Sequence, residues 1–340
     1  MRRNEYDVTD KIRTTDLKQV AGEVLRLYHG LYDGTRQPTA GTQTRAGGTS
    51  SGAMQRAFGD LDQLNRGEHP DYLPCDTEYH DIQHVLDVTL AMARLMDGYE
   101  RSRKVTRSRV GDSPALPAAC FSLGVTTALF HDFGYLRKRG DRRHRYGAEY
   151  TMTHVSRGSK HLYRYLPKIG LKRYANAGAT LVHYTGYERP AETIALNDTL
   201  LRRIGHMLGT ADIIAQMADR CYLEKCRDRL YPEFVLGGLA RRKLPGGRTQ
   251  VFFSSGEDLV RKTPQFYMNA AKRLDLQLAR AYEYAGRHFK GQNLYLEEMQ
   301  KNVRYAQAVG NAPGRQTLRR APPKTLNKGV EPYPKGLVIR

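Results

Sequence analysis

The chain has no tryptophan, only four cysteines and no uninterrupted apolar run long enough to cross a membrane. Cys75, Cys120, Cys221 and Cys226 show no Cys-x-x-Cys spacing, which argues against a zinc knuckle or a redox motif, so we expect reduced thiols. The N-terminus lacks the apolar stretch of a secretory signal. Together these absences predict a soluble cytoplasmic protein without a transmembrane segment.

Acidic residues are also scarce, with 35 Asp and Glu against 55 Lys and Arg, which gives a formal net charge of +20. An excess of positive charge attracts phosphate groups, including those of nucleotides, nucleic acids and anionic membranes. The residues from 301 to 340 carry nine Lys and Arg against one acid, Glu331, and include Pro-rich pieces. We expect a mostly disordered basic tail, which either only solubilises the protein or makes non-specific contact with nucleic acid.

Hydrophobic residues recur at three- and four-residue intervals along most of the chain, which is typical of amphipathic helices. Helices are predicted over 16–32, 79–96, 118–130, 147–166, 172–183, 191–205, 210–227 and 263–287. Residues 236–255 are broken by Gly and Pro and predict a long loop or hairpin. The predicted fold class is therefore all-α. A helix and a flexible Gly- and Thr-rich segment occupy 1–55, the main domain 56–300 and the tail 301–340.

Metal-binding chemistry first appears in a pair of histidines, His80 and His84, which a four-residue spacing places on one face of the predicted helix 79–96. A second pair, His131 and Asp132, ends the apolar segment 118–130. An imidazole and a carboxylate are costly to bury there unless a cation shares them. The alternative is that Asp132 caps the following turn and His131 bonds a carbonyl group.

A further carboxylate, Asp212, lies at the edge of an apolar helical stripe. The alternative interpretation makes Thr210 a helix N-cap and Asp212 a favourable first-turn acid. Taken in order, a His, a His-Asp doublet and a later Asp supply two imidazoles and two carboxylates. This donor set suits one or two divalent ions of Mn, Fe, Mg or Zn.

The same ordered set resembles the HD superfamily, whose all-α bundle holds one or two divalent metals. Residues 79–88 (YHDIQHVLDV) resemble the YHNxxHAxDV signature of class I cyclic nucleotide phosphodiesterases, and the resemblance extends over about 70–230. It implies an HD/PDEase-like helical bundle with metal ligands at His84, His131, Asp132 and Asp212, and proton donation to the leaving oxygen from His80. The chain departs from the signature at Asp81, where the family has Asn, and at 133–135, where the family has a further His-x-Gly.

Additional histidines complete a second metal site in some HD proteins. The candidates here are His154 and then His183, while His144 belongs to the basic loop 136–145. For each histidine, a solvent-facing or locally bonded side chain is the alternative. The basic residues of 137–143 either line an entrance that draws in an anionic substrate or form a solvated loop.

These features predict a metal-dependent phosphohydrolase, most simply a phosphodiesterase, that acts on a nucleotide-like phosphoester, with cyclic nucleotides among the candidate substrates. A bound metal would activate water and neutralise phosphate charge, and His80 would protonate the leaving group. Two other hypotheses remain open at this point. One is an HD-fold di-iron oxygenase, and the other is a non-catalytic module that binds a nucleotide or nucleic acid.

Overall fold

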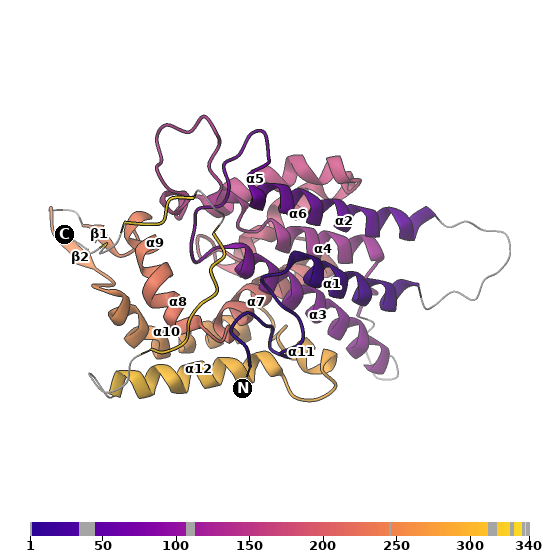
Figure 1. Ribbon diagram of the computed structural model, residues 1–340. Coiled ribbons are helices and arrows are strands. Elements are labelled where there is room, and N and C mark those ends of the chain that lie inside the picture. Colours follow the sequence, from indigo (N-terminus) through magenta and orange to yellow (C-terminus); the bar gives the residue numbers. More distant parts are fainter. Residues whose placement is uncertain are drawn as a thin grey trace.

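The computed structural model describes residues 2–33, 45–106, 113–244, 246–311, 318–326, 330–334 and 337. Helices dominate these ranges, which confirms the all-α prediction, and one short antiparallel hairpin projects from them (Figure 1). The α-helices are α1 (Leu17–Tyr32), α2 (Arg45–Arg66), α3 (Ile82–Thr106), α4 (Ala118–Leu129), α5 (His154–Tyr165), α6 (Ala175–Leu181), α7 (Thr199–Ala218), α8 (Tyr222–Lys225), α9 (Tyr231–Leu236), α10 (Gly256–Leu276), α11 (Glu283–His288) and α12 (Leu294–Asn311). Shorter elements are the 3-10 turns η1 (Phe133–Tyr135), η2 (Gly147–Tyr150), η3 (Leu166–Ile169), η4 (Lys172–Tyr174), η5 (Val182–Tyr184) and η6 (Ala191–Thr193), the π-turn η7 (Cys226–Leu230), and the strands β1 (Arg241–Lys243) and β2 (Thr249–Val251).

The hydrophobic core is built around α3, which packs against α1, α4, α7 and α11 (Figure 1). Every residue of α3 from 88 to 100 is buried, and α4 is buried from Cys120 to Leu129. Burial of a Leu, Met or Phe side chain stabilises a fold by about 1.5–3 kcal/mol. These two helices therefore hold in place the elements that carry the candidate site.

Helix α1 shows how the sequence sets a helix boundary. The Asp16 carboxylate accepts hydrogen bonds from the backbone N–H groups of Lys18 and Gln19, which would otherwise lack partners at the helix start. Val20 and Val24 are fully buried, as the three- and four-residue spacing predicts. The helix predicted over 16–32 is confirmed.

Two predicted helix boundaries are wrong, and both corrections change the site. The segments predicted over 191–205 and 210–227 contain one continuous helix, α7, because Gly205 and Gly209 are covered by Tyr184 rather than exposed at a break. Helix α3 begins at Ile82, because the Asp81 carboxylate accepts from the His84 N–H group (2.9 Å) and so caps the helix. His80 therefore precedes α3 and does not share a helix face with His84.

Other predicted segments have the expected kind of secondary structure but different boundaries. The segment 147–166 contains η2 and α5 separated by a turn, and 263–287 contains the end of α10 and then α11. The hairpin of β1 and β2 lies within the predicted loop 236–255. Of the Gly-rich segment 34–52, residues 45–52 belong to α2, and residues 34–44 lie outside the described residues.

The C-terminal segment differs from the sequence prediction of a mostly disordered tail. Residues 301–311 form the second half of α12, and parts of the chain beyond it lie beside α8 and α9 (yellow in Figure 1). The Arg320 N–H group donates to Glu224 (3.0 Å), and Tyr333 is buried against Tyr146. The basic, Pro-containing composition of this segment predicts disorder. The contacts that order it come from elements distant in the sequence, which composition does not reveal.

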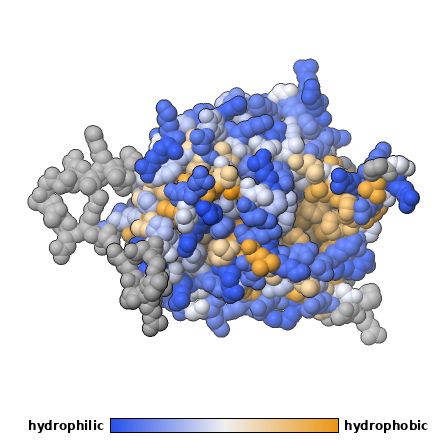
Figure 2. Space-filling model, turned by 180° about the vertical axis from the view of Figure 1, so that it is seen from behind, coloured by the Kyte–Doolittle hydropathy of each residue, from blue (hydrophilic) through white to orange (hydrophobic). Residues whose placement is uncertain are grey.

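The surface is largely hydrophilic on the face shown in Figure 2, and hydrophobic atoms gather on the side of the hairpin and α10. Exposed apolar side chains from these two elements include Val251, Phe252, Phe266 and Met268. All four cysteines are free thiols, as predicted. Within the described ranges, no helix has both the length and the apolar character needed to cross a membrane.

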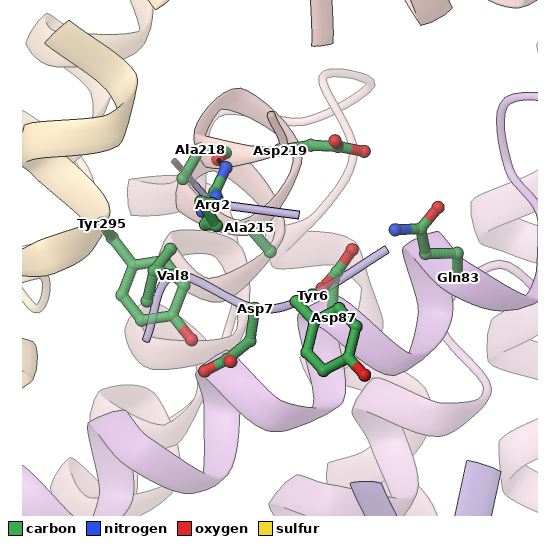
Figure 3. Close-up of a pocket in the computed structure, with 10 residues that line it drawn as sticks. All are labelled: Arg2, Tyr6, Asp7, Val8, Gln83, Asp87, Ala215, Ala218, Asp219 and Tyr295. Carbon is green, nitrogen blue, oxygen red and sulfur yellow. Dashed lines mark hydrogen bonds between the residues drawn. The ribbon is translucent and has the colours of Figure 1, made fainter. Parts of the chain in front are cut away.

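A small cavity between the N-terminal segment, α3, α7 and α12 is lined by Arg2, Asp7 and Asp219 among others (Figure 3). Asp7 and Arg2 also belong to a buried ionic network that joins the N-terminal segment to α3 and α12. The side chains of Asp7 and Arg94 are each 2% exposed and are joined by a 2.5 Å contact between Oδ2 and Nη2. Burial alone would raise the pKa of Asp7, but the positive charge of Arg94 and several hydrogen bonds lower it overall. Asp7 therefore stays ionised and neutralises the buried guanidinium.

Replacing Asp7 with asparagine is expected to lower the free energy of unfolding by about 3–5 kcal/mol, because the Arg94 charge then stays buried without a partner. Chemical denaturation of the full chain measures this change. Asp10→Asn is the matched control, since the Asp10–Arg3 pair is solvent-exposed and should contribute little. Equal denaturation midpoints for the two variants would contradict this account of the network.

Candidate metal centre

Three mutually packed helices bring the predicted metal ligands together. His84 lies in the first turn of α3, and His131 and Asp132 follow the end of α4. Asp212 lies in the interior of α7, which packs against both other helices. The fold thus joins residues that are as far as 128 positions apart, as 212 and 84 differ by 128.

The donor atoms of these residues converge on one point. The Nε2 atom of His84 lies 3.2 Å from the Nε2 atom of His131 and 3.2 Å from Oδ2 of Asp132. The distance between His131 Nε2 and Asp132 Oδ2 is 3.1 Å. Oδ1 of Asp212 lies 3.4 Å from His84 Nε2 and 3.9 Å from His131 Nε2. All four ligands predicted from the ordered set are therefore in one cluster.

The cluster has the chemistry of a cation site. His84, His131 and Asp132 are buried, and their ligand atoms lie within 4.8 Å of one another. Asp132 Oδ2 is buried without a hydrogen bond of good geometry. An unsatisfied buried carboxylate oxygen beside two imidazole nitrogens is costly, and a shared cation would satisfy all three atoms. These residues therefore fit a divalent metal ion.

The orientation of His131 supports the same conclusion. Its Nδ1 atom lies 2.8 Å from the carbonyl oxygen of Ala128, a contact in which the nitrogen donates. This bond leaves the lone pair of Nε2 directed at the cluster, as is usual for histidines that bind metals. Burial opposes protonation of His131, but the charge of Asp132 and its hydrogen bond raise the pKa of His131 to about 9. The pKa of Asp132, despite burial, is held well below its usual value by His131.

These shifts show that the cluster needs positive charge. Without metal, a proton on Nε2 of His131 would supply that charge; a metal ion would replace this proton and bind the lone pair that it leaves. The alternative for His131 and Asp132 is wrong in its first part, because the Asp132 side chain makes no capping bond to η1. Its second part is confirmed, because His131 bonds the carbonyl oxygen of Ala128. The helix-start interpretation of Asp212 is also wrong, because α7 begins thirteen residues earlier, at Thr199.

Beside the cluster, His80 forms a short ion pair with Glu233, a residue that sequence analysis did not single out. His80 Nδ1 lies 2.5 Å from Oε2 of Glu233. The Tyr79 N–H group donates to the other oxygen of Glu233 at 2.7 Å, and the carboxylate is completely buried. Burial opposes protonation of His80, but the Glu233 carboxylate raises the pKa of His80 to about 9. His80 therefore carries a proton at neutral pH.

His154 lies close to the cluster, as predicted. Its Nε2 atom is 3.9 Å from Oδ1 of Asp132, and its Nδ1 atom contacts the carbonyl oxygen of Thr151 at 2.6 Å. The Tyr135 ring lies stacked on the rings of both His154 and His80, at centroid distances of 4.4 and 4.5 Å. Burial lowers the pKa of His154, which favours the neutral form that binds metals.

The structure does not bring His183 into this group. It lies in η5, and none of the contacts between described residues joins it to the cluster. His144 contacts Asp141 at 3.1 Å within its own loop, as expected for a locally bonded histidine. In the basic loop, Arg137 pairs with Asp76 and Arg139 donates to the carbonyl oxygens of 67 and 69. These two arginines thus hold the loop in place.

The cluster is deep on one side and open on the other. The side chains of His84, His131 and Asp132 are at most 6% exposed. Those of His80, His154 and Asp212 are 17%, 20% and 14% exposed. The part of the cluster nearest to solvent is therefore the side that carries His80, His154 and Asp212.

An amide also supports the ligand from α7, and this contact was not predicted. Gln216 Nε2 lies 3.5 Å from Oδ1 of Asp212, and Tyr79 donates its hydroxyl hydrogen to Gln216 Oε1 at 3.1 Å. Gln216 lies one helical turn after Asp212, and this four-residue spacing was the only feature of the sequence that could have predicted the contact. The residue resembles many polar helix residues, and only the contact shows its role.

Gly134→Ala is expected to destabilise the protein by about 1–3 kcal/mol or more and to displace His154, because the added methyl group has no space. A Cβ atom at 134 would lie 1.8 Å from the carbonyl oxygen of His154. Gly140→Ala is the control in the next loop, because nothing lies within 4 Å of its Cβ position. Thermal unfolding of both variants measures the difference, and equal stabilities would contradict the close packing at Gly134.

The residues of this centre could hold a cation, and that cation could bind an anion. The histidines beside it could then transfer protons to or from the bound anion. Two imidazoles and two carboxylates face a common point, and a protonated histidine lies beside them. His80 and His154 are more exposed than the buried residues His84, His131 and Asp132. Comparisons of the chain with models of protein families, with curated proteins and with solved structures find no match.

Proposed function

We propose that the protein is a metal-dependent phosphohydrolase, of the phosphodiesterase type, that cleaves a nucleotide-like phosphoester. The observation that carries this proposal is the convergence of His84, His131, Asp132 and Asp212 at 3.1–3.9 Å. His80 lies beside them, paired with Glu233 at 2.5 Å. The resemblance of this ordered set to the HD superfamily and to its cyclic nucleotide phosphodiesterases supports the same activity. The substrate is proposed only as a class, cyclic or linear.

A divalent metal such as Mn, Mg, Zn or Fe, when bound, would lower the pKa of a water molecule and neutralise phosphate charge. His84, His131, Asp132 and Asp212 would hold it. His154, 3.9 Å from the second oxygen of Asp132, would join them if a second ion binds.

The chain's own groups supply the remaining chemistry. His80 holds a proton on its ring at the edge of the cluster, and Glu233 both stabilises that charge and fixes the ring through Nδ1. Nε2 of His80 is therefore the atom that can donate a proton to the leaving oxygen of the ester. Tyr135 covers one face of the ring and limits its rotation. His80 is thus placed to act as the general acid.

Hydrolysis of phosphoesters by the metal-loaded full-length protein tests the proposal. Cyclic nucleotides, linear nucleotides, dinucleotides and a generic phosphodiester are each offered with Mn, Mg, Zn or Fe. We expect hydrolysis of at least one class, loss of activity with a chelator and recovery on adding metal back. His84→Ala should be inactive, whereas His29→Ala, at an exposed histidine of α1, should retain activity.

Three results would overturn the proposal. One is the absence of hydrolysis with every metal and every substrate class. Another is two irons per chain, with a mixed-valence spectrum and oxygen consumption, which would instead support the oxygenase hypothesis. The last is ligand binding without hydrolysis that persists in Asp132→Ala, as expected of a non-catalytic binding module.

A further inference from the structure

A second cavity, with a volume of about 240 Å³, lies between the first turns of α7 and the turn that precedes α11. Arg202, Arg203 and His206 of α7 line one side, and Tyr284 lines the other. Its lining residues include none of the metal-centre side chains. His206 lies six residues before Asp212, which is about 9 Å along the helix axis.

The cavity wall carries positive charge without a matching carboxylate. No acidic side chain is among its lining residues, and no ion pair between described residues involves Arg202 or Arg203. Most acids on the neighbouring segments have cationic partners: Asp97 pairs with Arg101 and His288, Glu100 with Arg103, and Glu283 with Arg280. The Asp198 carboxylate, at the start of α7, accepts from the Leu201 N–H group and does not line the cavity. The two arginines therefore bring like charges to one cavity, and an anion bound there would offset them.

The hydrogen-bonding groups of the wall are mainly donors. Arg202 donates from Nε to the carbonyl oxygen of Leu196 (3.2 Å) and from Nη2 to that of Asn197 (3.5 Å). Arg203 donates from Nη1 to the Tyr284 hydroxyl oxygen (3.1 Å). The Tyr284 hydroxyl hydrogen and the remaining guanidinium N–H groups are then available to a ligand. Arg203 also lies over the ring of Tyr99, at 5.3 Å, which fixes its direction.

His206 adds a neutral donor to the same wall. Burial lowers its pKa to about 4, helped by the positive charges of Arg202 and Arg203. The ring is held edge-on against Tyr184, with centroids 5.5 Å apart. A neutral imidazole can donate one N–H group without adding a third charge to the wall.

We propose that this cavity is a binding site for a small phosphate-bearing anion, separate from the metal centre. Guanidinium groups match the oxygens of a phosphate with paired hydrogen bonds, and a phosphate has enough oxygens to accept from two guanidinium groups at once. The volume is below the roughly 300–1,000 Å³ typical of pockets for drug-sized ligands, so inorganic phosphate, pyrophosphate or a short phosphorylated metabolite fits best. The proposal does not depend on the hydrolase activity.

Isothermal titration of the full-length protein with pyrophosphate, inorganic phosphate and glycerol 3-phosphate tests this site. Titrations use wild type and an Asp132→Asn variant, so that anions bound through a metal at the other centre are recognised. We expect saturable binding at one site in both proteins. Arg202→Gln should weaken it by about 10-fold or more, because it removes charge-assisted hydrogen bonds to the anion.

Arg164→Gln, at an exposed arginine of α5, is the matched control because it removes the same charge elsewhere. It should leave the affinity nearly unchanged, and Arg202→Lys should restore part of the affinity lost in Arg202→Gln. Circular dichroism confirms that each variant is folded. The proposal is wrong if no anion binds saturably, if both Gln variants weaken binding equally, or if Asp132→Asn alone abolishes binding.

Discussion

Asp132→Asn should abolish both metal binding and the hydrolysis that depends on it. The Oδ2 atom of Asp132 contacts both imidazoles of the cluster, at 3.1 and 3.2 Å, so it is the group that joins the two histidines. An asparagine has the same shape but no charge, and its amide nitrogen cannot bind a cation. Substituting a residue that only orients a metal ligand typically lowers metal affinity or activity by about 10- to 100-fold. Loss of the ligand itself should therefore lower kcat/KM by about 10³-fold or more.

Metal content and metal-dependent thermal stability are the direct measurements for this variant. Wild-type protein should melt at a higher temperature when metal is added, because a ligand that binds only the folded state stabilises it. Asp132→Asn should show neither this shift nor bound metal. Asp228→Asn, at an exposed carboxylate of η7, is the control and should behave as wild type. Retention of metal and activity by Asp132→Asn would show that the cluster is not the metal centre.

The cluster of His84, His131, Asp132 and Asp212 was predictable because its residues are chemically unusual for their positions. A histidine and an aspartate that end a largely apolar helix stand out in the sequence, since burial there is costly without a shared charge. His84 or Asp212 alone is weak evidence for a metal site. The prediction rested on the order in which all four residues occur along the chain. The structure adds the distances that bring them to one point.

The partner of His80 could not be predicted in the same way. Glu233 is 153 residues away, as 233 and 80 differ by 153, and it lies in a short helix that resembles many others. Its role appears only when α9 packs beside the end of the 79–80 segment. An acid in the otherwise apolar run YPEFVL was the only local signal.

The same distinction holds for the fold. Local signals such as the Asp16 cap and the periodic apolar residues of α1 predict helices well. The continuity of α7 was not predictable, because Gly205 and Gly209 normally weaken a helix and only contact with Tyr184 explains them. The C-terminal segment is similar, since its contacts with α8 and α9 involve residues more than 90 positions away, such as Glu224 with Arg320.

Glu233→Gln should leave metal binding intact and slow the chemical step. The amide oxygen of a glutamine can still accept the Tyr79 N–H bond, so the local backbone is preserved. It cannot stabilise a charged imidazole, and His80 then loses the main group that raises its pKa to about 9. Because general acid catalysis contributes about 10²- to 10⁴-fold, kcat should fall by a factor in that range at neutral pH.

The pH profile distinguishes this effect from a structural one. In wild type the acid form of His80 persists until the pH rises through its pKa, which the Glu233 carboxylate raises, so kcat should fall on the alkaline side of that pKa. In Glu233→Gln the limb should move to lower pH, while bound metal and KM change little. Glu78→Gln is the matched control, because Glu78 also contacts Tyr333 but does not contact His80. If Glu233→Gln and Glu78→Gln have the same profile as wild type, Glu233 does not act through His80 and the ion pair serves stability alone.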